Sequence, residues 1–366
     1  MKEEVILLEA SNLIAKIERE KRPASEIINS FTRTHKSFGS KDRKKLTDLV
    51  WIYIRHKMRL DYLYPTLPIS KRIEILNANT LQKNERMPFH IQMEVPDWIV
   101  QKIKNPEKEL PALLDSPQII LRANGNRAAI RQALLKEGVE TEETTLSPFG
   151  LVLKNRVNLN MLQSFKNGLI EVQDEGSQLV ALATKIKKGE TVLDYCAGAG
   201  GKSLIFAQMM EGKGKIISHD ISRQSLEELK KRALRAQIQM IETTTDLPKY
   251  LKKNPQLKFS HVVVDAPCSG TGTWRRCPDA RWKLTEEEFS SLLKKQQMIL
   301  KKASTYVEKG AYLSYMTCSL TQDENISQVQ KFLKTHPTFK LKTHKQFSPY
   351  QTKTDGLFVA VMQREM

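Results

Sequence analysis

Two of the four cysteines directly follow apolar runs of the kind that form buried strands. Cys268 lies in "VVVDAPCSGTG" (residues 262–272), and Cys318 lies in "AYLSYMTCSL" (residues 311–320). A thiolate is a strong nucleophile that can form a covalent intermediate with a substrate. The chain has no C-x-x-C pair, so we expect neither a metal site of common zinc spacing nor, in a reducing compartment, a disulfide. Free thiols remain, either reactive or buried.

A glycine-rich segment, "VLDYCAGAGGKS" (residues 192–203), has the pattern of a strand, a tight turn and the start of a helix. Such a turn brings backbone N–H groups close to a ligand. Three ligands compete for it. A phosphate-binding P-loop would need glycine where Cys196 stands, and a dinucleotide-binding loop would need glycine where Ser203 stands. The third is S-adenosylmethionine, whose amino-acid portion we expect over seven loop residues, which are Cys196, Ala197, Gly198, Ala199, Gly200, Gly201 and Lys202.

Acidic residues end three further predicted strands. Asp220 follows "KIISH", Asp246 follows "IETTT" and Asp265 follows "HVVV". An acid at the end of the strand after the glycine turn can accept hydrogen bonds from both ribose hydroxyls. One such acid could be a solvated loop residue, but three at successive strand ends favour a nucleoside pocket. We expect the ribose at Asp220, the adenine near Asp246, and Asp265 between cofactor and substrate.

The elements that must position these residues form the second half of the chain. From residue 169 to residue 366, six apolar strand candidates alternate with amphipathic helices, which predicts an α/β fold with a parallel sheet covered on both faces. Ligands bind beyond the carboxyl ends of such strands, where both cysteines fall. We expect residues 95–168 to form a small α+β module that binds RNA. Residues 77–94 read as a linker, and residues 1–76 as a helical region.

The motifs together resemble a known family. "DAPCSGTG", "TCSL", "DYCAGAGGKS" and "EVQDEGSQLVA" are similar to those of the RNA cytosine-5 methyltransferases of the Sun and nucleolar-protein family, which includes enzymes acting on 16S ribosomal RNA. The resemblance covers the chain from about residue 95 onward, and the N-terminal helices resemble a shortened NusB-type domain. It implies a Rossmann-like methyltransferase sheet with S-adenosylmethionine as cofactor.

The resemblance also implies roles for individual residues. Cys318, in the Thr-Cys motif, would attack carbon 6 of cytosine, and Cys268, in the Pro-Cys motif, would assist release of the product. Asp265 would hydrogen-bond the cytosine edge, and Lys202 would lie near the cofactor or the base. DNA cytosine-5 methyltransferases use the Pro-Cys position as nucleophile, so the residue types alone leave the two cysteines nearly equivalent.

The charge of the chain indicates its partners. Its 366 residues carry 59 Lys and Arg against 41 Asp and Glu, a net charge of +18. Such an excess favours a polyanion, because basic side chains release counterions from nucleic acid. We expect a monomer that binds RNA in the cytoplasm, ribosomal RNA before transfer RNA, and no membrane. An RNA-binding assembly factor without turnover and a DNA methyltransferase are the competing hypotheses.

One basic and aromatic segment has two interpretations. "TWRRCPDARW" (residues 273–282) could stack on bases and contact phosphates. It could equally be a structured loop packed by its own tryptophans. The residues concerned are Trp274, Arg275, Arg276, Arg281 and Trp282.

Overall fold

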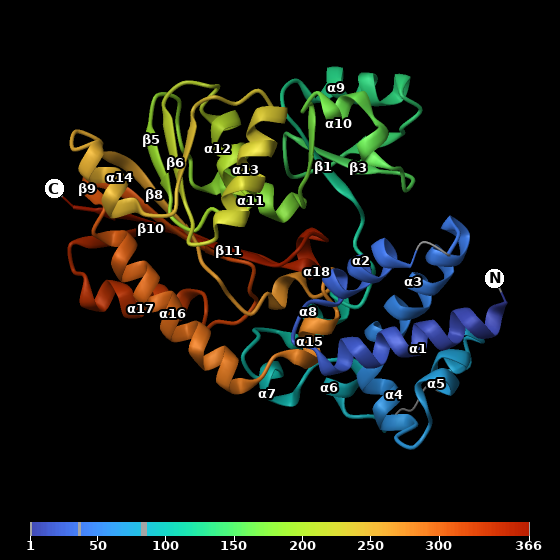
Figure 1. The fold of residues 1–366 in the computed structure, drawn as a ribbon. Helices are drawn as coiled ribbons and strands as arrows, with labels where there is room; N and C mark the ends of the chain where they lie inside the picture. The colour runs from blue at the N-terminus through green and yellow to red at the C-terminus, as the bar shows by residue number, and fades with distance from the viewer. Residues whose placement is uncertain (1, 36–37, 82–85, 366) are drawn as a thin grey trace. The chain divides into compact units, whose positions relative to one another are not determined.

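The computed structural model describes residues 2–35, 38–81 and 86–365. Residues 82–85 of the predicted linker lie outside the described residues. The chain divides into two compact units. Unit 1 comprises residues 1–116 and 273–288, and unit 2 comprises residues 117–272 and 289–366 (Figure 1).

Unit 1 is helical. Its helices are α1 (Glu3–Arg19), α2 (Ala24–Thr34), α3 (Ser40–Arg55), α4 (Lys57–Leu63), α5 (Ile69–Asn77), α6 (Phe89–Gln92), α7 (Asp97–Val100), α8 (Pro106–Ala112) and α15 (Asp279–Lys283). Apolar residues at spacings of three and four place one face of α1 and α3 in a common core, with Ile14, Ile17 and Leu46 almost fully buried. Residues 1–76 therefore form the helices that their apolar spacing predicted.

The last helix of unit 1, α15, lies more than 160 residues after the other helices of that unit in the sequence. Trp282 of α15 packs against the unit 1 core and its indole N–H donates to the carbonyl of Ile54 at 3.4 Å. Asp279 accepts a hydrogen bond from the backbone N–H of Ala24 at 2.9 Å, and Arg281 donates to the carbonyl of Leu113. Unit 1 is therefore built from two segments separated by 156 residues of unit 2.

Unit 2 contains a small four-stranded antiparallel sheet in the order β2-β3-β1-β4. Its elements are β1 (Ile120–Ala123), α9 (Arg127–Lys136), β2 (Thr141–Glu143), β3 (Gly150–Leu153), the short 3-10 helix Leu159–Met161, α10 (Gln163–Lys166) and β4 (Ile170–Val172). The module was expected over residues 95–168. The observed sheet begins later and includes β4, while residues 95–116 belong to unit 1.

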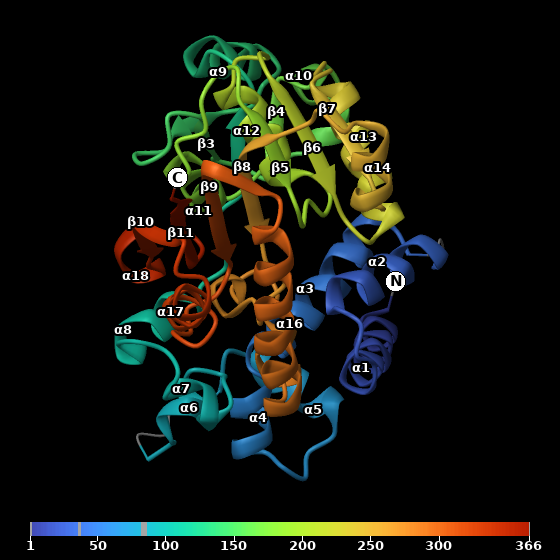
Figure 2. The same ribbon diagram turned by 90° about the vertical axis from the view of Figure 1, so that its left-hand side faces the viewer.

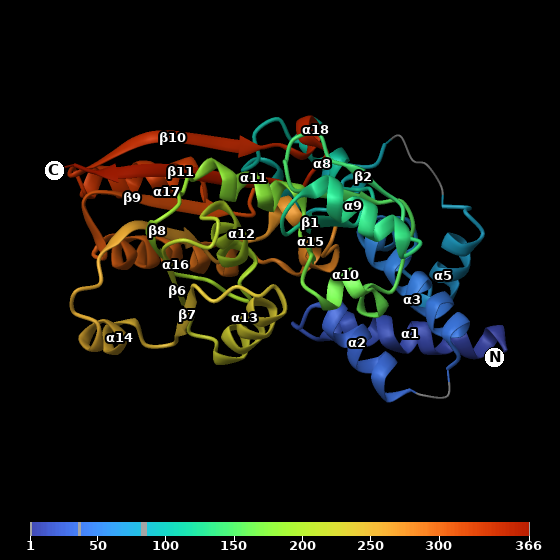
Figure 3. The ribbon, with the colours of Figure 1, turned by 90° about the horizontal axis from the view of Figure 1, so that it is seen from above.

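A seven-stranded sheet forms the rest of unit 2, in the order β10-β11-β9-β8-β5-β6-β7. Figure 3 shows β10, β11, β9 and β8 following one another at one end of this order and β6 and β7 at the other. The strands are β5 (Thr191–Asp194), β6 (Lys215–His219), β7 (Ile241–Thr244), β8 (Phe259–Asp265), β9 (Val307–Thr317), β10 (Phe339–Phe347) and β11 (Leu357–Arg364). Strands β5 to β9 are parallel, and only β11 runs against its neighbours.

Helices cover both faces of this sheet. They are α11 (Glu175–Ala183), α12 (Gly201–Met209), α13 (Arg223–Arg235), α14 (Leu247–Lys253), α16 (Glu286–Ser304) and α17 (Ile326–Thr335), followed by the short α18 (Pro349–Thr352). Helices α16 and α17 pack on one face through Leu300, Val329 and Phe332, and α11 and α12 pack on the other through Val180 and Phe206 (Figure 2). The prediction of a doubly covered sheet is confirmed.

Candidate active site

The predicted acids and the two cysteines gather at one edge of the seven-stranded sheet, together with Asp194, for which we predicted no role. Asp194, Asp220 and Asp265 lie at or just beyond the carboxyl ends of β5, β6 and β8, and Cys318 follows β9. Strands β6, β5, β8 and β9 are consecutive neighbours and parallel, so these ends meet. The sequence thus located this edge correctly, as expected for a parallel sheet.

The two cysteines are in direct contact. Cys268 Sγ lies 3.3 Å from Cys318 Sγ, and both thiols are free and half-buried. The backbone of Gly272 holds their loops together, since its N–H donates to the carbonyl of Cys318 at 3.0 Å. A Cβ at Gly272 would lie 1.8 Å from the carbonyl oxygen of Gly356. Only glycine therefore permits this close backbone approach beside the sulfurs.

Lys202 and Asp265 form an ion pair. Lys202 Nζ lies 2.6 Å from Asp265 Oδ2, and the Lys202 side chain is 11% exposed. Burial alone lowers the pKa of Lys202, but the carboxylate of Asp265 and the nearby Cys318 thiol more than offset it and raise that pKa. The pair therefore presents a fixed ammonium and a carboxylate together.

Asp220, at the end of the neighbouring strand β6, helps to fix the glycine loop. Asp220 Oδ2 accepts the N–H of Gly198 at 2.9 Å, and Asp220 Oδ1 accepts the N–H of Ser222 at 2.8 Å. Gly200 has φ +80°, and a Cβ there would lie 2.4 Å from Leu229 Cγ. A carboxylate can accept about four hydrogen bonds, so Asp220 retains acceptor capacity for two ribose hydroxyls.

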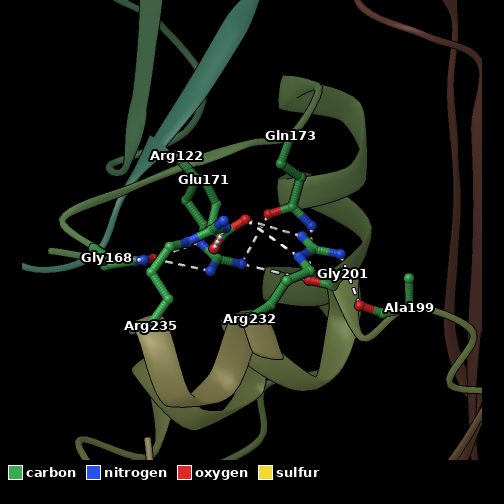
Figure 4. Close-up of polar contacts among 9 residues, drawn as sticks. Arg122, Gly168, Glu171, Gln173, Ala199, Gly201, Arg232 and Arg235 are labelled. Atoms are coloured by element: carbon green, nitrogen blue, oxygen red, sulfur yellow. Dashed lines mark hydrogen bonds and ion pairs between the residues drawn. The ribbon is translucent and has the colours of Figure 1, made fainter. Parts of the chain in front are cut away.

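A buried polar network holds two carbonyls of the same loop (Figure 4). Arg232 Nη1 donates to the carbonyl of Ala199 at 2.7 Å, and Gln173 Nε2 donates to the carbonyl of Gly201 at 2.9 Å. Glu171 pairs with Arg232 and also with Arg235. Because the next N–H in a trans peptide points opposite to its carbonyl, holding these carbonyls also fixes the N–H groups that follow them.

The network begins in the small module. Arg122 of β1 is completely buried and donates to Asn124 Oδ1 and to Gln173 Oε1, at 2.8 Å and 2.9 Å. Burial lowers the pKa of Arg122 to about 9 although Glu171 acts in the opposite direction. The four-stranded module is thus connected to the glycine loop by direct hydrogen bonds. Glu171 and Gln173 lie in the motif "EVQDEGSQLVA", but their residue types alone predicted no role for them.

The charge around the loop discriminates between the three candidate ligands. Asp194 is fully buried, accepts a hydrogen bond from the hydroxyl of Ser203 at 2.6 Å, and its other oxygen has no partner among the described residues. Burial raises the pKa of Asp194 to about 7, and the nearby Asp265 and Asp220 contribute in the same direction. Such a negative surrounding disfavours the phosphates of a nucleotide. It fits the sulfonium and ammonium groups of S-adenosylmethionine.

The surroundings of Cys196 and Asp246 limit the roles that these two predicted cofactor-binding residues can have. Burial, together with Asp194 and the other nearby acids, raises the pKa of the Cys196 thiol, which keeps it neutral. Asp246 is exposed and caps α14, since its Oδ1 accepts the N–H of Lys249 at 3.0 Å. Cys196 can therefore line the pocket only as a thiol, and Asp246 remains open to solvent on its other oxygen.

The basic and aromatic segment is largely interior. Trp274 is completely buried, Arg281 is 1% exposed and Arg275 is 7% exposed. Lys57 and Lys283 lie over the Trp282 ring, with Nζ 5.3 Å and 5.5 Å from its centroid. The geometry favours the packed-loop interpretation over stacking on RNA, because the Trp274 ring is buried and the partly buried Trp282 ring packs against the helical core.

Residues 181–363 match the family described as 16S rRNA methyltransferase RsmB/F. The chain is 30% identical over 326 residues to the ribosomal RNA small subunit methyltransferase B of Photorhabdus laumondii, covering 84% of this chain and 74% of the relative. This chain belongs to the RsmB/F family of 16S rRNA methyltransferases. Membership confirms the expected family and the expected cofactor, S-adenosylmethionine.

Two further comparisons support the match, and the second shows that the shared fold covers nearly the whole chain. The probable ribosomal RNA small subunit methyltransferase B of Bacillus subtilis is 31% identical over 297 residues, which cover 74% of this chain and 66% of the relative. The aligned part of this chain thus spans about two thirds of the length of that relative. The crystal structure of PH0851 aligns with a TM-score of 0.79 and 21% identity, covering 98% of each chain, and shares the fold. No helix within the described residues is long and apolar enough to cross a membrane.

Proposed function

We propose that this protein transfers a methyl group to carbon 5 of a cytosine in ribosomal RNA of the small subunit, through a covalent cysteine adduct. One observation carries the proposal. Two free thiols lie 3.3 Å apart at neighbouring strand ends, beside the Lys202–Asp265 ion pair. Carbon 5 of cytosine is a poor nucleophile, and a thiolate added at carbon 6 makes it reactive.

The reaction then divides into two halves. The Cys318 thiolate forms a bond to carbon 6, and carbon 5 gains electron density. S-adenosylmethionine, when bound, supplies the methyl group to carbon 5. A base next removes the carbon-5 proton, the bond between sulfur and carbon 6 breaks, and the Cys318 thiolate is restored. Cys268 lies close enough to Cys318 to assist that second half.

The polar groups nearby support this assignment of the two sulfurs. The Cys318 sulfur is among the groups that raise the pKa of Lys202, so the Lys202 ammonium and a negative charge on Cys318 favour one another. Cys268 instead faces Cys318 and the carboxylate of Glu324, and its hydrogen bond to Cys318, its burial and these negative neighbours raise its pKa well above the usual value. A thiolate is stabilised beside a cation and destabilised beside an anion. The surroundings therefore favour Cys318 as nucleophile.

The remaining residues would hold cofactor and base. The loop of residues 196–202 would take the amino-acid portion of the cofactor, Asp220 its ribose and Asp246 its adenine. Lys202 and Asp265 would present a donor and an acceptor to the polar edge of a flipped cytosine.

The experiment uses single cysteine variants and a denaturing gel. Cys318→Ala should abolish methylation and every covalent RNA adduct, because no other thiolate is placed to add to carbon 6. Cys268→Ala should still attack but release product slowly, so an adduct should accumulate. Cys277→Ala, an exposed cysteine to which we assign no role, is the control and should behave as the parent protein. Adduct accumulation in Cys318→Ala instead would reverse the roles, and unchanged methylation in both variants would refute the mechanism.

The substrate class needs a separate measurement. RNA and DNA strands carrying 5-fluorocytosine should be offered in parallel, since only an accepted substrate is trapped covalently. We expect trapping of RNA alone. No trapping at all would favour the assembly-factor hypothesis. Mapping 5-methylcytosine in a deletion strain would then distinguish ribosomal from transfer RNA.

A further inference from the structure

Glu324 is a buried carboxylate that no sequence pattern pointed to. It lies six residues after Cys318, before α17, and its side chain is completely buried. Its carboxylate accepts hydrogen bonds from the N–H of Ser269 at 2.8 Å and from the hydroxyl of Ser269 at 2.5 Å. Gln296 Nε2 donates at 2.9 Å and Thr321 Oγ1 at 3.1 Å. These donors come from three separate segments of the chain.

The first consequence is geometric. Ser269 directly follows Cys268, and Thr321 lies three residues after Cys318, so one carboxylate binds both cysteine loops. The loops are joined again by Thr271, whose hydroxyl accepts the N–H of Leu320 at 2.8 Å and lies 3.0 Å from the hydroxyl oxygen of Ser319. Hydrogen bonds through Glu324 and through Thr271 therefore hold the two loops at the separation that brings the sulfurs into contact.

The second consequence is electrostatic. All four hydrogen bonds to Glu324 come from neutral donors, and within the described residues no lysine, arginine or histidine forms an ion pair with it. Neutral donors stabilise a buried carboxylate but do not cancel its charge. Glu324 binds the backbone N–H and hydroxyl of the residue that follows Cys268, and its charge contributes to the raised pKa of that thiol, whereas Lys202 interacts with Cys318.

The other titratable groups around the sulfurs leave this asymmetry in place. Asp265 is paired with Lys202. Tyr315 is completely buried, and its hydroxyl donates to the carbonyl of Glu324 at 2.8 Å. Burial, followed by Cys268, Glu324 and Asp265, raises the pKa of Tyr315 well above its usual value, so it stays neutral. Cys196 is likewise neutral.

We infer that Glu324 is a positioning residue which keeps Cys268 as the thiol and so directs the single negative charge of the sulfur pair to Cys318. The inference rests on the proposed function, because it explains how two adjacent thiols acquire different roles. The Cys268 S–H would donate to the Cys318 thiolate, whose proton has already been lost to solvent. After the methyl transfer the same S–H is placed to donate to the Cys318 sulfur as the bond between that sulfur and carbon 6 breaks, while a separate base takes the carbon-5 proton.

The test measures the two thiols without RNA or cofactor. The intact protein is alkylated briefly with iodoacetamide from pH 6 to pH 10, and the labelling rate of each cysteine is read by peptide mass spectrometry. In the parent protein Cys318 should react first, with its rate rising at a pH at least one unit lower than that of Cys268. In Glu324→Gln, which keeps the size of the side chain and removes its charge, the ratio of Cys268 to Cys318 labelling at pH 7.5 should rise at least threefold.

Two controls make the result decisive. Glu324→Asp keeps the charge and should retain the order of labelling found in the parent, whereas a purely structural role would make it as disturbed as Glu324→Gln. Glu175→Gln neutralises another buried glutamate, which accepts the backbone N–H groups of Leu146 and Ser147, and should not alter the ratio. A parent protein in which Cys268 reacts at the lower pH overturns the inference even if Glu324→Gln fails to fold. The labelling rates are measured without turnover. They can therefore be interpreted even if the protein does not methylate cytosine, so failure of the inference and failure of the proposed function can be told apart.

Discussion

Two buried glutamates of unit 2 each fix a loop at the active edge of the sheet, yet their surroundings differ. Glu171 is 2% exposed and is neutralised by Arg232 and Arg235, which in turn reach the glycine loop (Figure 4). Glu324 is equally buried but is surrounded by hydroxyl, amide and backbone donors. Both loops are held, but only the second carboxylate leaves its charge uncompensated.

The difference separates two uses of a buried charge. A carboxylate paired with two guanidiniums contributes little field beyond its partners, so Glu171 serves the geometry of the cofactor loop. A carboxylate bound only by neutral dipoles acts on whatever titrates beside it, which here is a thiol. The comparison predicts that Glu171 matters first for stability and Glu324 first for reactivity.

The largest effect should come from removing Glu171. Glu171→Ala leaves two arginines without their buried counter-charge, which typically costs about 3–5 kcal/mol of unfolding free energy. Urea denaturation followed by circular dichroism measures it. Glu143→Ala, at an exposed pair with Arg127, should change stability by less than about 1 kcal/mol. Equal losses in the two variants would contradict the comparison.

A third buried carboxylate, Asp194, should reveal itself through pH. Its pKa is raised from 3.8 to about 7, so between these values the folded state binds more protons than the unfolded state. Stability should therefore fall as pH rises through that window and stay low above it. Asp194→Asn should remove this fall and gain on the order of 4 kcal/mol at pH 8 relative to pH 4. Denaturation curves of both proteins at pH 4 and pH 8 provide the measurement. If the unfolding free energy of the variant changed with pH as that of the parent does, the pKa of Asp194 would not be raised.

At the cofactor end, Asp220→Ala should weaken S-adenosylmethionine binding about tenfold or more. The variant loses the proposed charged contacts to the ribose and also the bond that holds the N–H of Gly198. Isothermal titration calorimetry measures the affinity. Asp246→Asn, which keeps an acceptor to cap α14, is the milder companion and should change the affinity no more than about threefold. An Asp220→Ala affinity equal to that of the parent would exclude the proposed placement.

The smallest effect distinguishes two arginines that share Glu171. Arg232→Gln loses the hydrogen bond to the Ala199 carbonyl and should weaken cofactor binding by about threefold to tenfold. Arg235→Gln loses only its contact with Glu171 and its position over the Phe165 ring, so it should bind cofactor as the parent does. Equal losses by calorimetry would mean that the network acts through stability alone.

The sequence predicted the catalytic half well, for a physical reason. Buried parallel strands are continuous apolar runs, and residues such as Val262 and Leu313 identify them directly. Strand β10 was missed, because five consecutive residues of "FKLKTHKQF" are exposed and the segment reads as polar. Glu324 was missed because its donors at residues 269, 296 and 321 are brought together only by the fold. For Arg281 and Trp282 the sequence left RNA contact and a packed loop equally open, since burial of a charged segment has no local signature.

The two-segment construction of unit 1 has a consequence for the order of synthesis. Residue 273 is translated 157 residues after Ser116, which at about 5–20 residues per second takes roughly 8 to 30 seconds. During that time the N-terminal helices are outside the ribosome without α15, and the site for the Trp282 indole beside Ile54 is empty. Strands β5 to β8 are already made, while β9 to β11 are still to come. The helical unit is therefore complete only at residue 288, before the last three strands of the sheet are made, and a nascent chain halted before that residue would hold neither unit finished.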